Sequence, residues 1–218
     1  VLVSGNNIIY VGDGNKVQQS TDNGANFTEL SPDTSNPSRT VQDMIIYGGD
    51  LYVAMSDGTD GTIRKYDVST TTWSDYNTVS KNYTRVFTAK DFIFGVDGTT
   101  GNLLNVSSGS GAPAIVKDLP DNTSWVGLTD AGAVILAAAS NGYVYSIKDD
   151  SGLTIKGQTF FEGEELTDII ESNGIIFVGA KQKNQQTNGF IGRLYMAELA
   201  VSDNLYVITG KQVMKEWG

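Results

Sequence analysis

Residues 134–137 read Val134-Ile135-Leu136-Ala137, a short apolar run of the kind that forms a buried strand. Similar runs recur along the chain: Ile8-Ile9-Tyr10-Val11, Leu51-Tyr52-Val53-Ala54, Phe92-Ile93-Phe94-Gly95 and Ile175-Ile176-Phe177-Val178. In chain order, the first residues of these runs lie 43, 41, 42 and 41 positions apart. Spacing this regular indicates a structural repeat of about 42 residues.

Each repeat contains other strand-like runs around the apolar one. One precedes it, as at residues 43–47, one follows it after a glycine, as at residues 143–145, and a weaker one closes the unit, as at residues 72–76. Asp-Gly and Asn-Gly pairs, which favour tight β-hairpin turns, lie between the runs, for example at Asp57 and Asn141. No stretch shows a sustained helical period, so each unit is predicted to be four short antiparallel strands.

Units of this size match the blades of a β-propeller, whereas leucine-rich and ankyrin repeats are shorter and contain helices. We therefore predict an all-β fold, a β-propeller of about five four-stranded blades. The expected blades are residues 1–40, 41–82, 83–123, 124–164 and 165–210. Residues 211–218 resemble a first strand. Either this tail pairs with the N-terminal blade and closes a ring, or the chain is part of a six- or seven-bladed parent.

The composition removes several classes of chemistry. The chain has no histidine and no cysteine, which excludes a Ser-His-Asp triad, a thiol nucleophile, a disulfide and the usual zinc ligands. We expect no cofactor and no metal. The net charge is −10, with 15 scattered basic residues, so nucleic acid is not an expected partner. The apolar run at residues 134–139 is far shorter than a membrane span, so membrane insertion is not expected.

The segment from Ser20 to Phe27 fits the pattern Ser-x-Asp-x-Gly-x-x-aromatic, with Asp22 and Gly24 at the inner positions. It resembles the Asp box of the BNR-repeat propellers, which include sialidases. In the turn, the Asp22 carboxylate would accept backbone N–H groups, Gly24 would supply a positive φ, and Phe27 would pack between sheets. In that family the box is a fold element away from the active site, so the resemblance implies a propeller and no glycosidase.

A second segment, from Tyr66 through Asp67 and Thr70 to Trp73, looks like the latter half of a kelch repeat. The double glycine of that repeat should follow the second strand, but Met55 and Ser56 occupy that place. This resemblance therefore also supports the architecture alone.

Sialidase chemistry would require three arginines around a carboxylate, a Tyr/Glu pair and an Arg-Ile-Pro motif, as the family resemblance implies. The chain has four arginines, Arg39, Arg64, Arg85 and Arg193, and no Arg-Ile-Pro. Arg64 and Arg193 are expected on third strands, away from the propeller axis. Sialidase activity is therefore not expected.

The strongest candidate site comes from the expected innermost strands. Counting back seven or eight residues from each apolar run gives Asp43, Arg85, Gly127 and Asp168 as equivalent positions. Asp43, Arg85 and Asp168 would then converge at one end of the central channel, where they would form a polar rim, bind a small ion or sugar, or act in catalysis. With Arg85 beside both carboxylates, we expect their pKa values to be lowered.

Two further segments have ordinary explanations. Residues 107–113 are glycine-rich but contain no lysine and precede no helix, which favours a strand connection over a phosphate site. Residues 181–189 lengthen the hairpin of the last blade, which indicates either a tolerated insertion or a partner contact.

These features favour a non-catalytic module, extracellular or virion-associated, that engages glycan or protein partners or serves as a structural piece of a larger ring or virion complex. The composition resembles that of adhesins, lectin-like propellers and phage tail components. The alternative is a glycoside hydrolase that uses Asp43 and Asp168 as its carboxylates.

Overall fold

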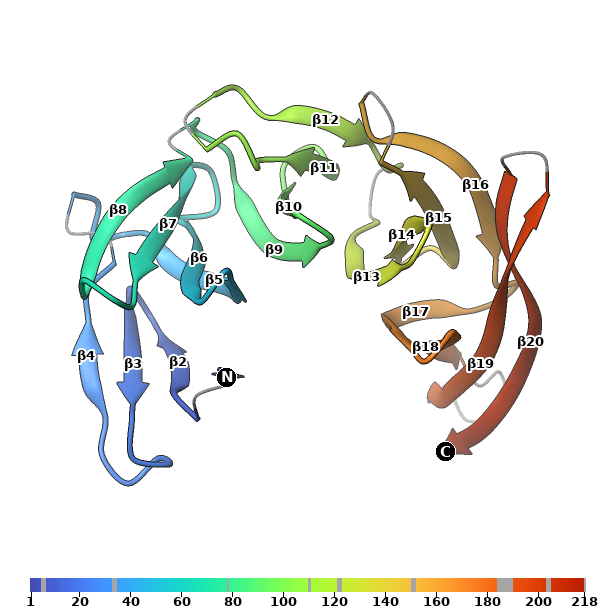
Figure 1. The fold of residues 1–218 in the computed structure, drawn as a ribbon, viewed down its shortest axis with the longest axis horizontal. Coiled ribbons are helices and arrows are strands. Elements are labelled where there is room, and N and C mark those ends of the chain that lie inside the picture. The colour runs from blue at the N-terminus through green and yellow to red at the C-terminus, as the bar shows by residue number, and fades with distance from the viewer. Residues whose placement is uncertain are drawn as a thin grey trace. The chain divides into compact units, whose positions relative to one another are not determined.

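The computed structural model describes residues 1–4, 7–32, 35–77, 79–109, 111–120, 123–149, 152–183, 190–202 and 205–217. In these residues, 20 strands form five four-stranded antiparallel sheets, and no helix occurs (Figure 1). The predicted all-β architecture of four-stranded units is confirmed. The lengthened hairpin expected at residues 181–189 lies largely outside the described residues.

Each sheet takes its four strands in chain order. Sheet 1 contains β1 (Leu2–Val3), β2 (Ile9–Asp13), β3 (Lys16–Ser20) and β4 (Thr28–Leu30). Sheet 2 contains β5 (Thr40–Tyr47), β6 (Asp50–Ser56), β7 (Gly61–Asp67) and β8 (Thr72–Asn77). Sheet 3 contains β9 (Tyr83–Ala89), β10 (Phe92–Asp97), β11 (Asn102–Asn105) and β12 (Ala114–Lys117).

The remaining sheets follow the same order. Sheet 4 contains β13 (Trp125–Ala131), β14 (Val134–Ala139), β15 (Tyr143–Lys148) and β16 (Thr154–Phe160). Sheet 5 contains β17 (Glu165–Ser172), β18 (Ile175–Lys183), β19 (Phe190–Ser202) and β20 (Leu205–Trp217).

The chain forms two compact units. The first comprises Val1–Thr88 and Phe92–Leu119, and the second comprises Ala89–Asp91 and Pro120–Gly218. Sheets 1 to 3 belong to the first unit, apart from the β9–β10 turn, and sheets 4 and 5 to the second. In Figure 1 the strands β4, β8 and β12 lie along one edge of the first unit, and β5 and β9 lie along the other.

The second strands of sheets 2, 3 and 4 are largely apolar because nearly all of their residues are buried, on both faces. On β6, Leu51, Val53 and Met55 pack toward sheet 1, whereas Tyr52 and Ala54 pack toward sheet 3. All six residues of β14 are buried. This two-sided burial explains why the repeat is visible as short continuous apolar runs and not as an alternating pattern.

The core of the second unit lies between sheets 4 and 5. From sheet 4 it includes alternate residues of β14 and one of β15, namely Val134, Leu136, Ala138 and Val144. From sheet 5 it includes inward-facing residues of all four strands, among them Ile169, Val178, Ala197 and Tyr206.

Among the described residues, the C-terminal tail pairs within sheet 5 and not with sheet 1, while the six- or seven-bladed parent stays a prediction. Residues 211–217 continue β20 and pair with β19, with Trp217 opposite Gly192. The reason is local: β19 is 13 residues long and offers partners beyond the expected end of the sheet. A positive φ of 63° at Gly210 lets β20 bend and continue there. Ring closure by this tail therefore has no support in the strand pairing described.

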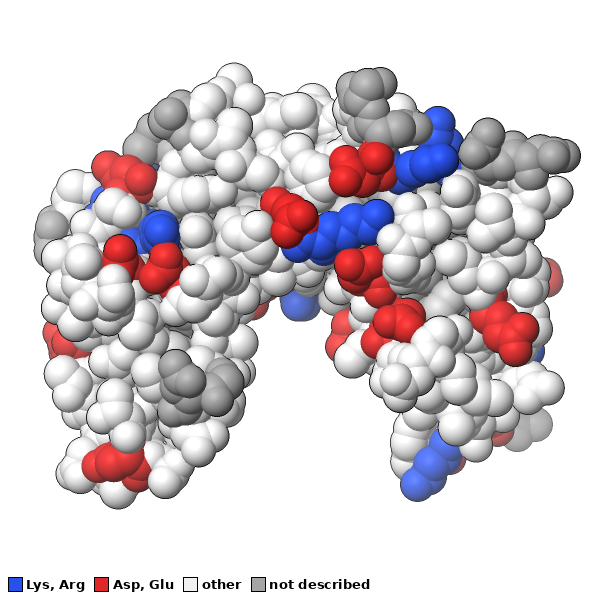
Figure 2. Space-filling model, in the orientation of Figure 1, with Lys and Arg blue, Asp and Glu red and all other residues white. Residues whose placement is uncertain are grey.

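Charged side chains of both signs are interspersed on the face drawn in Figure 2, without a large basic patch. Among the described residues, no helix is long and apolar enough to cross a membrane.

Candidate functional site

The structure places the four equivalent positions on the first strands of four sheets, as predicted. Asp43 lies on β5, Arg85 on β9, Gly127 on β13 and Asp168 on β17. Asp43 and Arg85 belong to the first unit and lie on adjacent sheets, whereas Asp168 belongs to the second unit. Their convergence on one site stays a prediction.

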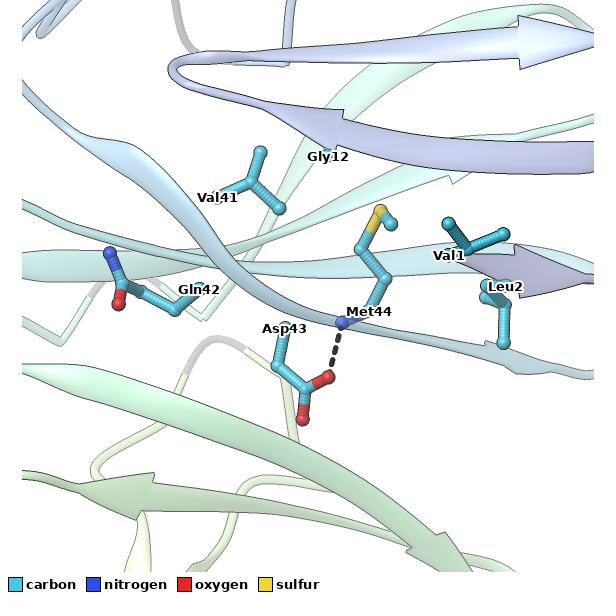
Figure 3. A pocket seen from close by; sticks show the side chains of 7 residues that line it. All are labelled: Val1, Leu2, Gly12, Val41, Gln42, Asp43 and Met44. Carbon is cyan, nitrogen blue, oxygen red and sulfur yellow. Dashed lines mark hydrogen bonds between the residues drawn. The ribbon is translucent and has the colours of Figure 1, made fainter.

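The Asp43 carboxylate joins the first strands of two sheets. Asp43 follows a β-bulge at which Gln42 is the extra residue of β5. The N–H of Met44 donates to Oδ1 at 2.9 Å (Figure 3), and the N–H of Val86 on β9 donates to Oδ2 at 3.2 Å. Both carboxylate oxygens are therefore engaged by backbone donors, one of them across the boundary between sheets 2 and 3.

The pKa of Asp43 moves in the direction opposite to the one expected. Burial raises the pKa of the carboxyl above 3.8, and this effect outweighs the two backbone hydrogen bonds and the charge of Arg85, which lower it. Arg85 is exposed, and no ion pair joins it to Asp43 among the described residues, so water screens its charge. The expectation of a lowered pKa at Asp43 is therefore wrong.

A small pocket of about 210 Å³ lies beside Asp43 in the first unit (Figure 3). Its lining comprises Val1, Leu2, Gly12, Val41, Gln42, Asp43 and Met44. The exposed Gln42 side chain hydrogen-bonds to Thr40 and to the Ser56 carbonyl. Asp43 is thus the one ionisable side chain in this lining, and it is already held by backbone groups.

In the second unit, Asp168 Oδ1 accepts the N–H of the next residue, Ile169, at 2.8 Å, as Asp43 Oδ1 accepts the N–H of Met44. Ile169 holds the position in sheet 5 that Val86 holds in sheet 3. A Cβ on Gly127, the preceding blade's equivalent of Asp43, would lie 2.6 Å from Asp168 Oδ1 and 2.9 Å from Ile169 N. The missing side chain at Gly127 therefore makes room for the Asp168 carboxylate. In both units, a carboxylate accepts the N–H of an inward-facing residue, Val86 or Ile169, of a first strand.

This packing gives a prediction for Gly127→Ala. The added methyl group would contact the Asp168 carboxylate and the backbone of Ile169, so we expect a loss of about 1–3 kcal/mol in the free energy of unfolding. Urea titration followed by circular dichroism measures it. The double variant with Asp168→Ala should recover part of the loss, because one of the two obstacles is gone. Equal stability of Gly127→Ala and the parent chain would refute this account.

The segment from Ser20 to Phe27 forms the expected turn between β3 and β4. Ser20 Oγ donates to Asp22 Oδ1 at 2.8 Å and accepts the N–H of Gly24 at 2.8 Å. Asn26 donates its backbone N–H to Asp22 Oδ1 at 2.9 Å and its side-chain amide to Oδ2 at 2.7 Å. Gly24 has a φ of 88°. Phe27 differs from expectation, since it precedes the three-residue β4 and stays 46% exposed.

These hydrogen bonds, those from Asn26 first, lower the pKa of Asp22 to about 2. We expect Asp22→Ala to lower the melting temperature at pH 7, because the turn loses its acceptor. A carboxyl whose pKa is lowered in the folded state stabilises the fold at pH values above its unfolded pKa, near 3.8. This stabilisation is lost as the pH falls toward 2. The difference in melting temperature should therefore shrink between pH 4 and pH 2. A difference independent of pH would contradict this role.

The kelch-like segment also forms an ordered turn. Asp67 Oδ1 accepts the N–H groups of Ser69 and Thr70 at 2.9 and 3.0 Å. The rings of Tyr66 and Trp73 pack at 5.0 Å between centroids. Both motif resemblances therefore correspond to structural turns at the same place in a sheet.

Sequence reasoning missed a buried polar cluster in the second unit. The Glu164 side chain is 2% exposed, and its Oε1 accepts Arg193 Nη1 at 2.6 Å and the Tyr195 hydroxyl at 2.8 Å. Arg193 Nε also donates to Glu216 on β20 at 2.8 Å. Arg193 and Tyr195 are two residues apart on β19, so the sequence indicates that they share one face of the strand. Their contact with Glu164 depends on tertiary packing and could not be inferred.

The electrostatics of this cluster are those of a structural ion pair. The hydrogen bond to Glu164 raises the pKa of Arg193, and burial, reinforced by Glu164, raises the pKa of Tyr195. A tyrosine nucleophile would need the opposite shift.

No family model and no curated protein matches the chain. Similar solved structures include BamB from Moraxella catarrhalis, with a TM-score of 0.61 and 14% identity over 88% of this chain and 57% of that chain. A luciferin-regenerating enzyme has a TM-score of 0.65 and 10% identity over 98% of this chain and 77% of that chain. Kluyveromyces lactis Hsv2 has a TM-score of 0.60 and 8% identity over 99% of this chain and 71% of that chain.

The chain thus spans 57% of the length of the BamB chain. At identities of 8–14%, the likeness concerns the fold and carries no activity or partner across. BamB, Hsv2 and the luciferin-regenerating enzyme are β-propellers. Together with the five four-stranded antiparallel sheets, this likeness shows that the chain has a β-propeller fold.

Proposed function

We propose that the chain is a non-catalytic β-propeller module, secreted or virion-associated, that binds a glycan or a protein partner or forms a structural part of a larger ring or virion complex. The observation that supports this proposal most is the state of Asp43. Its two oxygens accept backbone N–H groups at 2.9 and 3.2 Å, as a fold element would. Catalysis needs a carboxyl free to exchange a proton with substrate.

We also propose that the Ser20–Phe27 turn is an Asp box and that the Tyr66–Trp73 turn is its kelch-like counterpart in sheet 2. Their hydrogen bonds stay within each turn, which supports a structural role. The net charge of −10 supports partners other than nucleic acid or an acidic membrane surface.

A glycoside hydrolase remains the second candidate because burial raises the pKa of Asp43. A raised carboxyl pKa is what a general acid requires, and Asp168 would then be the second carboxylate. Against this, both Asp43 oxygens accept backbone N–H groups, one of them from sheet 3, and these hydrogen bonds favour the ionised carboxylate over the protonated acid that a proton donor must be.

The non-catalytic module and the glycoside hydrolase predict different results in a hydrolysis assay. We expect no hydrolysis of chromogenic furanosides, pyranosides or sialosides by the intact chain between pH 4 and pH 8. Release of the chromophore would be followed by absorbance, with Asp118→Asn, on an exposed residue, as the matched variant. Turnover that disappears in Asp43→Asn or Asp168→Asn and persists in Asp118→Asn would overturn the non-catalytic assignment.

A further inference from the structure

An aromatic row crosses sheet 4 from its first strand to its last. Trp125 on β13 packs against Tyr145 on β15 at 5.5 Å between ring centroids, and Tyr145 stacks on Tyr143 at 6.0 Å. Tyr143 stacks on Phe160 of β16 at 4.6 Å with an interplanar angle of 29°. Exposure rises along the row, from 0% at Trp125 to 45% at Phe160.

Phe160 is fixed by two contacts to its ring and one to its backbone. Tyr143 is its direct cross-strand partner. A Cβ on Gly142 would lie 3.0 Å from the Phe160 ring, so the glycine lets the ring lie close to the backbone. The Phe160 carbonyl accepts Lys211 Nζ at 2.8 Å. A ring already fixed in this way loses little conformational entropy when something stacks on it.

One exposed polar side chain neighbours Phe160 along β16. The exposed side chain of Gln158 is two residues before Phe160 on β16, so both side chains stand on the same face of the sheet. A glutamine amide both donates and accepts hydrogen bonds, as the paired hydroxyls of a sugar require. The other exposed position of β16 is Thr154. A protein interface, in contrast, needs about 800 Å² per partner with an apolar centre.

We infer that the Phe160 ring, held by Tyr143 and flanked by Gln158, is a stacking site for a pyranose ring of a glycan. The apolar C–H face of the sugar would cover the exposed ring, and its equatorial hydroxyls would reach the Gln158 amide. The inference rests on the proposed binding function and assigns it to the outer strand of sheet 4.

The test uses the intact chain and three neutral tetrasaccharides, the β-1,4-linked oligomers of glucose, N-acetylglucosamine and mannose. Saturation-transfer NMR detects binding, and isothermal titration measures affinity. We expect at least one tetrasaccharide to bind. Phe160→Leu, which keeps an apolar side chain but not the flat ring, should weaken that binding about tenfold, and Phe160→Tyr should change it less than about threefold.

Phe27→Leu is the matched control because Phe27 is 46% exposed but lies in the β3–β4 turn, in the first unit. This variant should bind like the parent chain. Binding that is unchanged in Phe160→Leu, or weakened equally in both variants, would overturn the Phe160 site while leaving glycan binding itself in place. If no tetrasaccharide binds, the pyranose site is wrong. Capture of a protein partner lost in Phe160→Leu would reassign this surface.

Discussion

Replacing Gly157 with alanine is expected to lower the free energy of unfolding by about 3 kcal/mol, which corresponds to roughly 10 °C in melting temperature. A Cβ at this position on β16 would lie 2.0 Å from the carbonyl oxygen of Tyr206 and 2.9 Å from its carbonyl carbon. Because the obstacle is backbone, no side-chain rotation relieves it. Sheets 4 and 5 would have to separate.

That separation would disturb neighbouring contacts of the same interface. The N–H of Ile208 donates to Thr159 Oγ1 at 2.8 Å, and Tyr206 and Ile208 are 6% and 4% exposed in the core between the two sheets. Urea titration at pH 7 measures the loss.

Gly152→Ala is the matched control for Gly157→Ala, because Gly152 is exposed and a Cβ there meets nothing within 4 Å. It should stay within about 0.5 kcal/mol of the parent chain. If Gly157→Ala is as stable as Gly152→Ala, sheets 4 and 5 do not approach as closely as described.

The repeat pattern could be predicted because the second strand of each four-stranded repeat carries the clearest sequence signal. β6, β10 and β14 are buried on both faces, so their apolar runs stand out against a polar chain. The outer strands carry a weaker signal, since β4 and β12 are largely exposed. The C-terminal tail shows the limit of this reasoning. The sequence of residues 212–217 predicts a strand, but it does not predict that this strand pairs with β19, because that depends on the length of β19.

The strand positions of Asp43 and Asp168 could be predicted from the sequence, whereas the chemistry around Asp43 could not. Repeat equivalence placed Asp43 and Asp168 on first strands, because the spacing to the apolar run is nearly constant. The direction of the Asp43 pKa shift could not be inferred, since it depends on burial beside a bulge and on screening of Arg85 by water. The role of Gly127, which stands where sheet 2 has Asp43, could not be inferred from the sequence either. It depends on the Asp168 carboxylate and the Ile169 N–H, which occupy the space that a side chain at Gly127 would need.

The second large effect is expected for Arg193→Met. The variant would leave the Glu164 carboxylate, 2% exposed, without its positive partner in the interior of the second unit. Removing one partner of a buried ion pair typically costs about 3–5 kcal/mol, because the remaining charge loses compensation for its desolvation. Arg193 itself is 20% exposed, so we expect about 3 kcal/mol. Thermal and urea unfolding at pH 7 measure the loss.

Two comparisons distinguish this mechanism from a general loss of packing. The double variant Arg193→Met with Glu164→Gln should be more stable than Arg193→Met alone, because the uncompensated charge is gone. Lys16→Met removes a partner at a similar distance, 2.7 Å, from an exposed pair in which Lys16 and Glu29 are 42% and 45% exposed. It should cost less than about 1 kcal/mol, since water replaces the lost interaction. An equal loss at both sites would mean that burial of Glu164 does not govern the pair.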